Sequence, residues 1–410
     1  MKDCAGWSGS GKRGPEGPLV PHLSAFERLL GTRGYAPTTV RLKVRLVCDF
    51  SAWLSRRRIS VQRITLEQAE RYLRHRGQHR RPRRGDSADL KQLLELLGEE
   101  GIVAQQKACN PTTPVDRLLD RYGLYLRDER AVYPGTAVTY TRVARGFLEH
   151  RFGGGRPNLS ALRTTDVLSF VQHQVARGSR KTAQLACSAL RSFLQYARYR
   201  GEITTDLAAG VPEVANWSMP SIPRSIAADD LRRVLAHCNR RSAVGSRDYA
   251  ILLLLARLGL RAGAIALLEL DDIDWQAATL RVRGKGGHAH VLPLPVEVGE
   301  AIVAYLKIGR PVSTSRRLFL RAKAPIGGFK SQLAILAVVK HALIRAGIDA
   351  PSKGAHQFRH ALASEMLRQG ASLPEIGQIL DHRSPQTTAI YAKVDLASLH
   401  TLALPWPGGA

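Results

Sequence analysis

Apolar residues recur every three or four positions through most of the first half of the chain. From residue 26 to 54, and again from about 115 to 209, this spacing predicts amphipathic helices. Thr65 and Gln68 form a capping box that begins a further helix. We therefore expect two helical blocks, separated by the Pro-containing stretch over residues 110–114.

The two helical blocks begin with similar residues. Each has a proline, a threonine and a phenylalanine at the same relative spacing. These are Pro37, Thr39 and Phe50 in the first block and Pro134, Thr136 and Phe147 in the second. The correspondence is compatible with an internal duplication, and equally with two independent blocks that share an amphipathic pattern.

The last part of the chain mixes helices with short strands. Helices are expected over residues 247–258, 264–270, 333–346 and 355–369, with a short one capped by Ser372 and Glu375 and another begun by Ser384 and Pro385. Strands are expected over residues 278–282 and 290–294, and the glycines between them predict a hairpin with a Gly-rich tip. The predicted fold class is mainly α, with several domains and a small antiparallel sheet.

These patterns divide the 410 residues into six segments, in agreement with two or three domains for a chain of this length. They are a flexible tail over 1–22, an extra helical domain over 23–108, a second helical domain over 115–212, a Pro-containing linker over 213–224, a mixed domain over 225–397 and a tail over 398–410. The extra domain is a candidate for DNA binding.

The chain carries a strong positive charge. Lys plus Arg number 61 against 34 for Asp plus Glu, so the formal net charge is +27. This balance predicts a polyanionic partner. Apolar residues make up 44% of the chain, which argues against a disordered basic tail protein. The basic run over residues 80–84 is either a solvated loop or a direct phosphate contact.

Cysteine usage and hydropathy indicate the compartment. The five cysteines are scattered without a C-x-x-C pair, which favours neither a disulfide framework nor a structural zinc site. The apolar run over residues 249–256 is too short to span a bilayer, and the N-terminus lacks the apolar core of a signal peptide. These observations predict a cytoplasmic protein without a membrane partner.

Two arginines are candidates for anion binding. His356 and Arg359 are three residues apart near the start of an expected helix, so both side chains can face one anion, although H-x-x-R alone is a weak signal. Arg261 follows an almost wholly apolar helix and needs a partner there. That partner is either an anion or a structural carboxylate such as Glu269 or Asp271.

Three further positions carry candidate chemistry. Lys285 lies at the expected hairpin tip, where a flexible loop brings its ammonium to a site or leaves it in solvent. His382 precedes Tyr391 in the last helical stretch, where a tyrosine is also compatible with a half-buried packing role. Taken singly, none of these residues decides the function.

In this order and spacing, the candidate residues resemble those of the tyrosine recombinase (phage integrase) family. The resemblance rests on LGLRAGAIALLELDDIDW, LRVRGKGGHAHVLPLP, GAHQFRHALASEML and LPEIGQILDHRSPQTTAIYAKV. It implies a recombinase catalytic domain over residues 225–397, preceded by a SAM-like core-binding domain in the second helical block. Transferred by position, it gives the catalytic residues Arg261, Lys285, His356, Arg359, His382 and Tyr391.

The resemblance also implies a mechanism. Tyr391 attacks a DNA phosphodiester, His356 acts as the base and Lys285 as the general acid, while Arg261, Arg359 and His382 bind the phosphate. The bond energy is kept in a 3′-phosphotyrosyl intermediate. No ATP, metal or other cofactor is therefore expected.

The sequence departs from the family pattern at three positions. Ala264 stands where the family often has Glu, Asp381 where it often has Gly, and Phe358 where it often has Leu. These changes bear on geometry and rate, since every catalytic position is filled. His360 also matches a frequent family residue, for which a packing or supporting role is expected.

An acidic cluster offers a different chemistry. Asp271, Asp272 and Asp274 are close enough in sequence to hold Mg²⁺ in a metal-dependent nuclease. Turn formation is the better interpretation of carboxylates at this helix-to-strand junction.

We therefore expect a site-specific DNA recombinase or integrase of a mobile or transposon-borne genetic element. The resemblance implies double-stranded DNA as partner and a tetramer on synapsed sites, composed of this chain alone or mixed with companion recombinases, at the nucleoid. The alternatives are relaxation of the type IB topoisomerase kind and a non-catalytic accessory protein or repressor. Apolar residues after Tyr391 suggest packing on a neighbouring protomer or on the same domain, namely Leu396, Leu399, Leu402 and Leu404.

Overall fold

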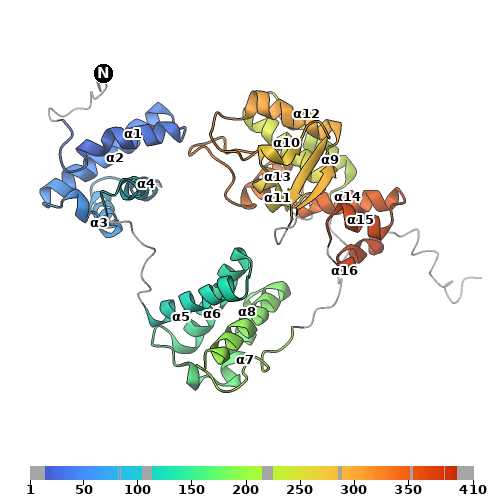
Figure 1. Ribbon diagram of the computed structural model, residues 1–410, viewed down its shortest axis with the longest axis horizontal. Coiled ribbons are helices and arrows are strands. Elements are labelled where there is room, and N and C mark those ends of the chain that lie inside the picture. The colour runs from blue at the N-terminus through green and yellow to red at the C-terminus, as the bar shows by residue number, and fades with distance from the viewer. Residues whose placement is uncertain are drawn as a thin grey trace, which may run out of the picture. The chain divides into compact units, whose positions relative to one another are not determined.

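The computed structural model describes residues 14–81, 83, 85–103, 113–214, 225–284, 289–350, 354–382 and 384–394. Lys285, most of the expected linker and the leucines beyond residue 395 lie outside these described residues. The chain divides into two compact units, residues 1–105 with 219–410 and residues 106–218. Figure 1 shows a mainly helical protein with one small sheet, as predicted.

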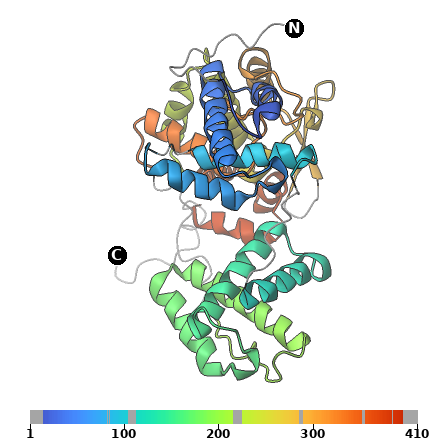
Figure 2. The same cartoon turned by 90° about the vertical axis from the view of Figure 1, so that its left-hand side faces the viewer.

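The first helical block contains four helices, seen together in Figure 2. They are α1 (Leu23–Thr32), α2 (Pro37–Arg56), α3 (Leu66–Gly77) and α4 (Asp86–Glu99), with a 3₁₀ turn over Val61–Arg63 before α3. The predicted capping box of Thr65 and Gln68 is present. The prediction of a flexible tail up to residue 22 is wrong at its end, because Leu19 is fully buried and its N–H donates to the Ser51 hydroxyl at 3.1 Å.

The second helical block repeats this order of elements. It consists of α5 (Pro114–Leu124), α6 (Pro134–Phe152), α7 (Thr164–Arg177) and α8 (Arg180–Tyr199), with a 3₁₀ turn over Leu159–Ala161 before α7. In both blocks the second helix begins at a proline, Pro37 or Pro134, and buries a phenylalanine, Phe50 or Phe147. The sequence correspondence therefore lies at equivalent places in two four-helix blocks.

The third region combines helices with a hairpin. Its elements are α9 (Ala228–Ala236), α10 (Ala243–Arg257), α11 (Ala262–Leu267), β1 (Ile273–Asp274), β2 (Thr279–Arg283), β3 (Ala289–Pro293), α12 (Val296–Ala304), α13 (Leu333–Arg345), α14 (His356–Arg368), α15 (Leu373–Ile379) and α16 (Pro385–Thr388). The strands form an antiparallel sheet in the order β1-β2-β3, with Leu280 paired to Leu292. The paired strands of the hairpin are confirmed, whereas α9, β1 and α12 were not predicted.

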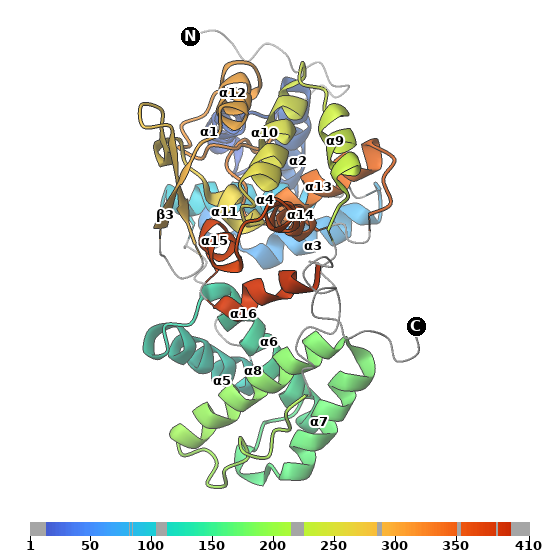
Figure 3. The same cartoon turned by 90° about the vertical axis from the view of Figure 1, so that its right-hand side faces the viewer.

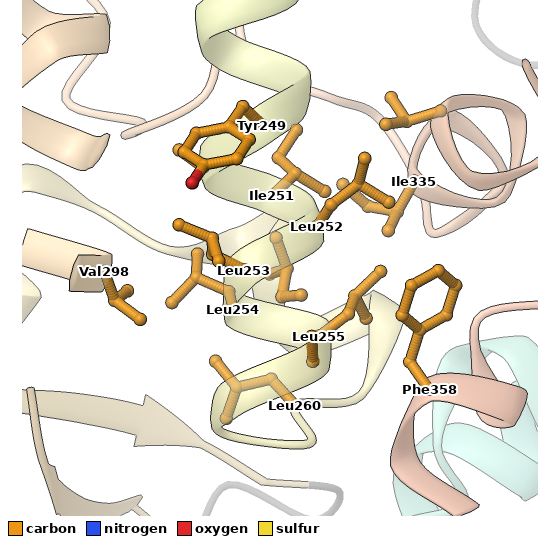
Figure 4. Packing of buried hydrophobic residues seen from close by; sticks show 14 of the residues in the cluster. Tyr249, Ile251, Leu252, Leu253, Leu254, Leu255, Leu260, Val298, Ile335 and Phe358 are labelled. Atoms are coloured by element: carbon orange, nitrogen blue, oxygen red, sulfur yellow. The ribbon is translucent and has the colours of Figure 1, made fainter. Parts of the chain in front are cut away.

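Helix α10 is the centre of this region. Its residues from Ala250 to Leu255 are fully buried, which explains the almost uninterrupted apolar run. In Figure 4, Phe358 of α14 and Ile335 of α13 lie beside α10, and both are fully buried members of the same cluster. Burial of Phe358 therefore fixes the first turn of α14, which carries the H-x-x-R residues, on the domain core.

The end of the described chain forms a smaller cluster of its own. Helix α15 packs against α14 and against α16, as Figure 3 shows for the same domain. The buried residues of this cluster, which come from α14, α15 and the chain that follows it, are Ala363, Ile376, Leu380 and Tyr391. No helix in the described ranges is long and apolar enough to cross a membrane.

Candidate active site

The C-terminal end of α15 organises the site. Helix α15 ends in a Schellman motif, in which the N–H of Asp381 donates to the Gln378 carbonyl at 3.0 Å and the N–H of His382 to that of Gly377 at 2.9 Å. This turn requires a left-handed residue after the C-cap Leu380, and Asp381 has φ +50°. The motif fixes the carbonyls of residues 380 and 381 and the backbone of His382.

Both predicted phosphate-binding arginines meet this turn. The Arg359 guanidinium donates to the Gly259 carbonyl at 2.6 Å and also to the Leu380 carbonyl. Arg359 is 7% exposed, and burial, aided by the charge of Arg261, lowers its pKa to about 10. Arg359 therefore stays cationic at neutral pH and is held by two backbone oxygens.

Arg261 is bound by Asp381. Its Nη1 donates to the Asp381 carboxylate at 2.9 Å and its Nη2 to the Asp381 carbonyl at 2.8 Å. The structural partners considered for Arg261 pair elsewhere: Glu269 contacts Arg317 at 3.3 Å, and Asp271 contacts Arg316. Arg261 thus shares the α15 turn with Arg359, and within the described ranges it has no ion pair with the acidic cluster.

His382 is held neutral in this cationic surrounding. Its Nδ1 lies 2.8 Å from the Thr388 hydroxyl. Burial and the charges of Arg359 and Arg261 lower its pKa to about 4. A neutral imidazole can accept the Thr388 hydroxyl proton at Nδ1, and in that tautomer its Nε2 carries the proton and can donate to a phosphate oxygen.

Tyr391 lies in the 3₁₀ helix Ala389–Val394, which continues α16. Its ring stacks on His382, with centroids 6.4 Å apart and planes 7° apart. The side chain is 1% exposed, and this burial raises its pKa, an effect opposed by the charge of Arg359. The phenol is therefore protonated and covered in the free protein.

The residue that contacts the phenol is His360. Its Nδ1 lies 3.0 Å from the Tyr391 hydroxyl, while the His356 ring lies 6.3 Å from the His360 ring between centroids. Burial, with the nearby His356 and Arg359, lowers the pKa of His360. Sequence reasoning assigned the base to His356 and a supporting role to His360. The sequence did contain a signal for His360. It lies four residues after His356, so both histidines fall on the same face of α14.

The acidic cluster forms turns and ion pairs. Asp272 accepts the N–H of Glu269 at 2.9 Å and contacts Arg283 at 3.1 Å. Asp274 accepts the N–H groups of Gln276 and Ala277. Among the described residues, no group of three or more His, Cys, Asp or Glu side chains is placed to hold a metal ion.

The described site thus combines a tyrosine, two arginines and two histidines, a set suited to attack on a phosphodiester. Comparison with known proteins agrees with this chemistry. Residues 224–397 match the phage integrase family, and residues 119–201 match the phage integrase N-terminal SAM-like domain. The chain is 51% identical over 400 residues to the putative integrase/recombinase y4rA of Sinorhizobium fredii, covering 97% of both chains. It is 30% identical to the tyrosine recombinase XerD of Mycobacterium tuberculosis, covering 71% of this chain and 96% of that protein.

Solved structures share the fold. A XerH site-specific recombinase bound to palindromic difH substrate gives a TM-score of 0.55 at 17% identity, covering 84% of this chain and 98% of that one. A lambda integrase dimer bound to a COC′ core site gives 0.52 at 19% identity, covering 67% and 94%. The chain belongs to the phage integrase family of tyrosine recombinases, enzymes that break and rejoin DNA.

Proposed function

We propose that this recombinase cleaves and rejoins double-stranded DNA through a covalent bond between Tyr391 and a 3′ phosphate, in order to integrate or mobilise a genetic element. One observation carries the proposal: Tyr391 contacts His360 and stacks on His382. His382 directly follows the turn at the end of α15 whose carbonyls bind Arg261 and Arg359. This set supplies a nucleophile, neutral imidazoles and two fixed cations within one domain.

The arginines supply the electrostatic part of catalysis. Attack on a phosphodiester adds negative charge to its non-bridging oxygens, and preorganised cations stabilise that charge without reorganisation. Arg359 is held by the backbone carbonyls of residues 259 and 380, so its position is set before DNA binds. His382 adds a neutral donor to a phosphate oxygen.

The proton transfers then balance. The Tyr391 oxygen forms a bond to phosphorus, its proton passes to His360, and the bond from phosphorus to the 5′ oxygen breaks. Lys285, the proposed general acid, protonates that 5′ oxygen. We assign the base to His360 because its ring contacts the phenol of Tyr391. We place His356 beside the phosphate, because it lies in the first turn of α14, where the positive end of the helix dipole favours an anion.

The partner assembly is proposed from charge and fold together. A net charge of +27 favours a DNA phosphate backbone. A structure with the same fold, at a TM-score of 0.52, is a lambda integrase tetramer bound to a Holliday junction. We propose that four protomers act on two DNA duplexes in the cell, formed from this chain alone or with companion recombinases. We also propose that the extra helical block over residues 23–108 binds DNA, and that the domains have the boundaries inferred from the sequence.

The experiment uses labelled duplex DNA from the boundaries of the element that carries the gene, nicked beside the exchange point so that cleavage becomes irreversible. The full chain and Tyr391→Phe are incubated with it in EDTA, denatured, and inspected for label that migrates with protein. We expect an adduct with the wild type and none with Tyr391→Phe. Tyr249→Phe, a buried tyrosine on α10 away from this turn, should retain the adduct.

The same assay tests the base and the alternatives. His360→Ala should slow adduct formation more than His356→Ala, and the opposite order returns the base to His356. Relaxation of supercoiled DNA of any sequence would indicate topoisomerase action. Absence of an adduct on DNA that the protein binds would favour an accessory or repressor role.

A further inference from the structure

We infer that Asp381 is a positioning residue that holds Arg261 in place for the scissile phosphate. This inference rests on the proposed function, because it assigns Arg261 to the phosphate. It concerns a residue whose side chain has no part in the mechanism above.

The backbone at Asp381 gives the first argument. Its φ of +50° lies in the left-handed region, where glycine is the residue without strain and where the C′ position of a Schellman motif normally has glycine. Asp is one of the few other residues that tolerate this region. A non-glycine residue in a strained conformation at a candidate site suggests that its side chain has a use there.

The contacts give the second argument. Arg261 donates two hydrogen bonds to Asp381, one to the carboxylate at 2.9 Å and one to the carbonyl at 2.8 Å. In the described part of the chain, Asp381 is the only carboxylate in an ion pair with Arg261, and position 264 on α11 is alanine. Arg359, by contrast, is held by two backbone carbonyls, so only Arg261 depends on a side chain.

The number of free N–H donors bears on whether the Asp381 carboxylate anchors Arg261 or blocks it from the phosphate. A guanidinium has five N–H donors, and the two bonds to Asp381 leave three of them. The Arg261 side chain is 36% exposed, so it is not closed off from an anion in solvent. The carboxylate therefore orients the guanidinium while leaving donors for the phosphate.

The test compares Asp381→Gly and Asp381→Asn with the wild type on the nicked substrate. Asp381→Gly removes the carboxylate and relieves the backbone, so the unfolding midpoint should stay equal or rise while single-turnover cleavage falls about tenfold or more. Asp381→Asn retains a neutral acceptor and should lose less. DNA affinity should change by less than about threefold, since most binding comes from other phosphate contacts.

A matched control separates the backbone from the carboxylate. Ala278 is a second non-glycine residue at positive φ, 47°, and it is exposed in the turn before β2. Ala278→Gly relieves the same kind of strain and should leave cleavage unchanged. A methylphosphonate at the scissile position lacks the charge that Arg261 neutralises, so on that substrate the gap between Asp381→Gly and the wild type should shrink.

Each outcome is decisive. Cleavage by Asp381→Gly at the wild-type rate overturns the inference, and faster cleavage shows that the carboxylate obstructs the phosphate. A slower variant with an equal defect on the methylphosphonate, or with a lowered unfolding midpoint, indicates a merely structural role. If the wild type itself forms no adduct, the proposed function fails, and the inference fails with it.

Discussion

The lowered pKa of His382 makes the stability of the folded protein depend on pH. Its imidazole takes up a proton near its ordinary pKa of 6.5 in the unfolded chain but only near about 4 in the folded site. Between these values the unfolded state binds more protons, so the stability that the neutral His382 contributes is lost as pH decreases from about 6.5 to about 4, and this contribution changes no further below that. We expect the thermal midpoint to fall across this range, and the fall to be smaller in His382→Gln.

A control for this measurement is available on α9. His237 is exposed, and its Nδ1 lies 2.9 Å from the Arg233 carbonyl of the same helix. His237→Gln should therefore keep the wild-type slope of midpoint against pH. An unchanged slope in His382→Gln would show that another group causes the acid sensitivity.

At the level of residues, order and spacing pointed to side chains that the structure places close together, but they could not assign every contact. Order and spacing selected Arg261, Arg359, His382 and Tyr391, and the structure brings these four together at the α15 turn. Spacing could not decide which of two histidines one helical turn apart reaches Tyr391. That contact depends on the 3₁₀ helix Ala389–Val394, whose path follows from packing.

At the level of elements, Gly259 connects α10 to the site. It has φ +56°, its carbonyl accepts from Arg359, and an added Cβ would lie 2.7 Å from Leu380 Cδ2. Gly259→Ala combines backbone strain with this clash and should destabilise the protein by about 1–3 kcal/mol. It should also displace Arg359 and slow cleavage, as measured by urea unfolding and the adduct assay.

Gly347 provides the comparison. It has φ +64° in the same domain, but an added Cβ there would meet nothing within 4 Å. Gly347→Ala should cost about 1 kcal/mol and leave cleavage intact. Equal losses of cleavage in both variants would refute a specific role for Gly259.

The elements themselves were predictable where the periodicity is long. The two helical blocks and helices α10, α13 and α14 agree with the apolar spacing, although α4 was not among the predicted helices. The hairpin strands differ from their predicted bounds by one residue at each end. Strand β1 has only two residues, Ile273 and Asp274, which is too short to show an alternation. Leu19 was missed because a single apolar residue among glycines and prolines has no period, although its contacts bury it fully.

At the level of the whole molecule, the two four-helix blocks raise the question of what the first one binds. Its loop between α3 and α4 presents exposed arginines at residues 80, 81 and 83. If this loop contacts the DNA backbone, each lost arginine contact lowers the slope of log affinity against log salt by about 0.9. We expect Arg81→Gln with Arg83→Gln to lower that slope by about two units in titrations of the full chain.

The control must remove the same charge without removing a contact. Arg232 and Arg368 are exposed on other helices, and each is already paired, with Asp229 and Glu365. Arg232→Gln with Arg368→Gln changes the net charge equally, so it changes the long-range field to a similar degree. Because counterion release depends on phosphate contacts rather than on net charge, its slope should match the wild type. Equal slopes for the two double variants would instead make the loop between α3 and α4 a solvated one, and the charge that binds DNA would then have to lie elsewhere on the chain.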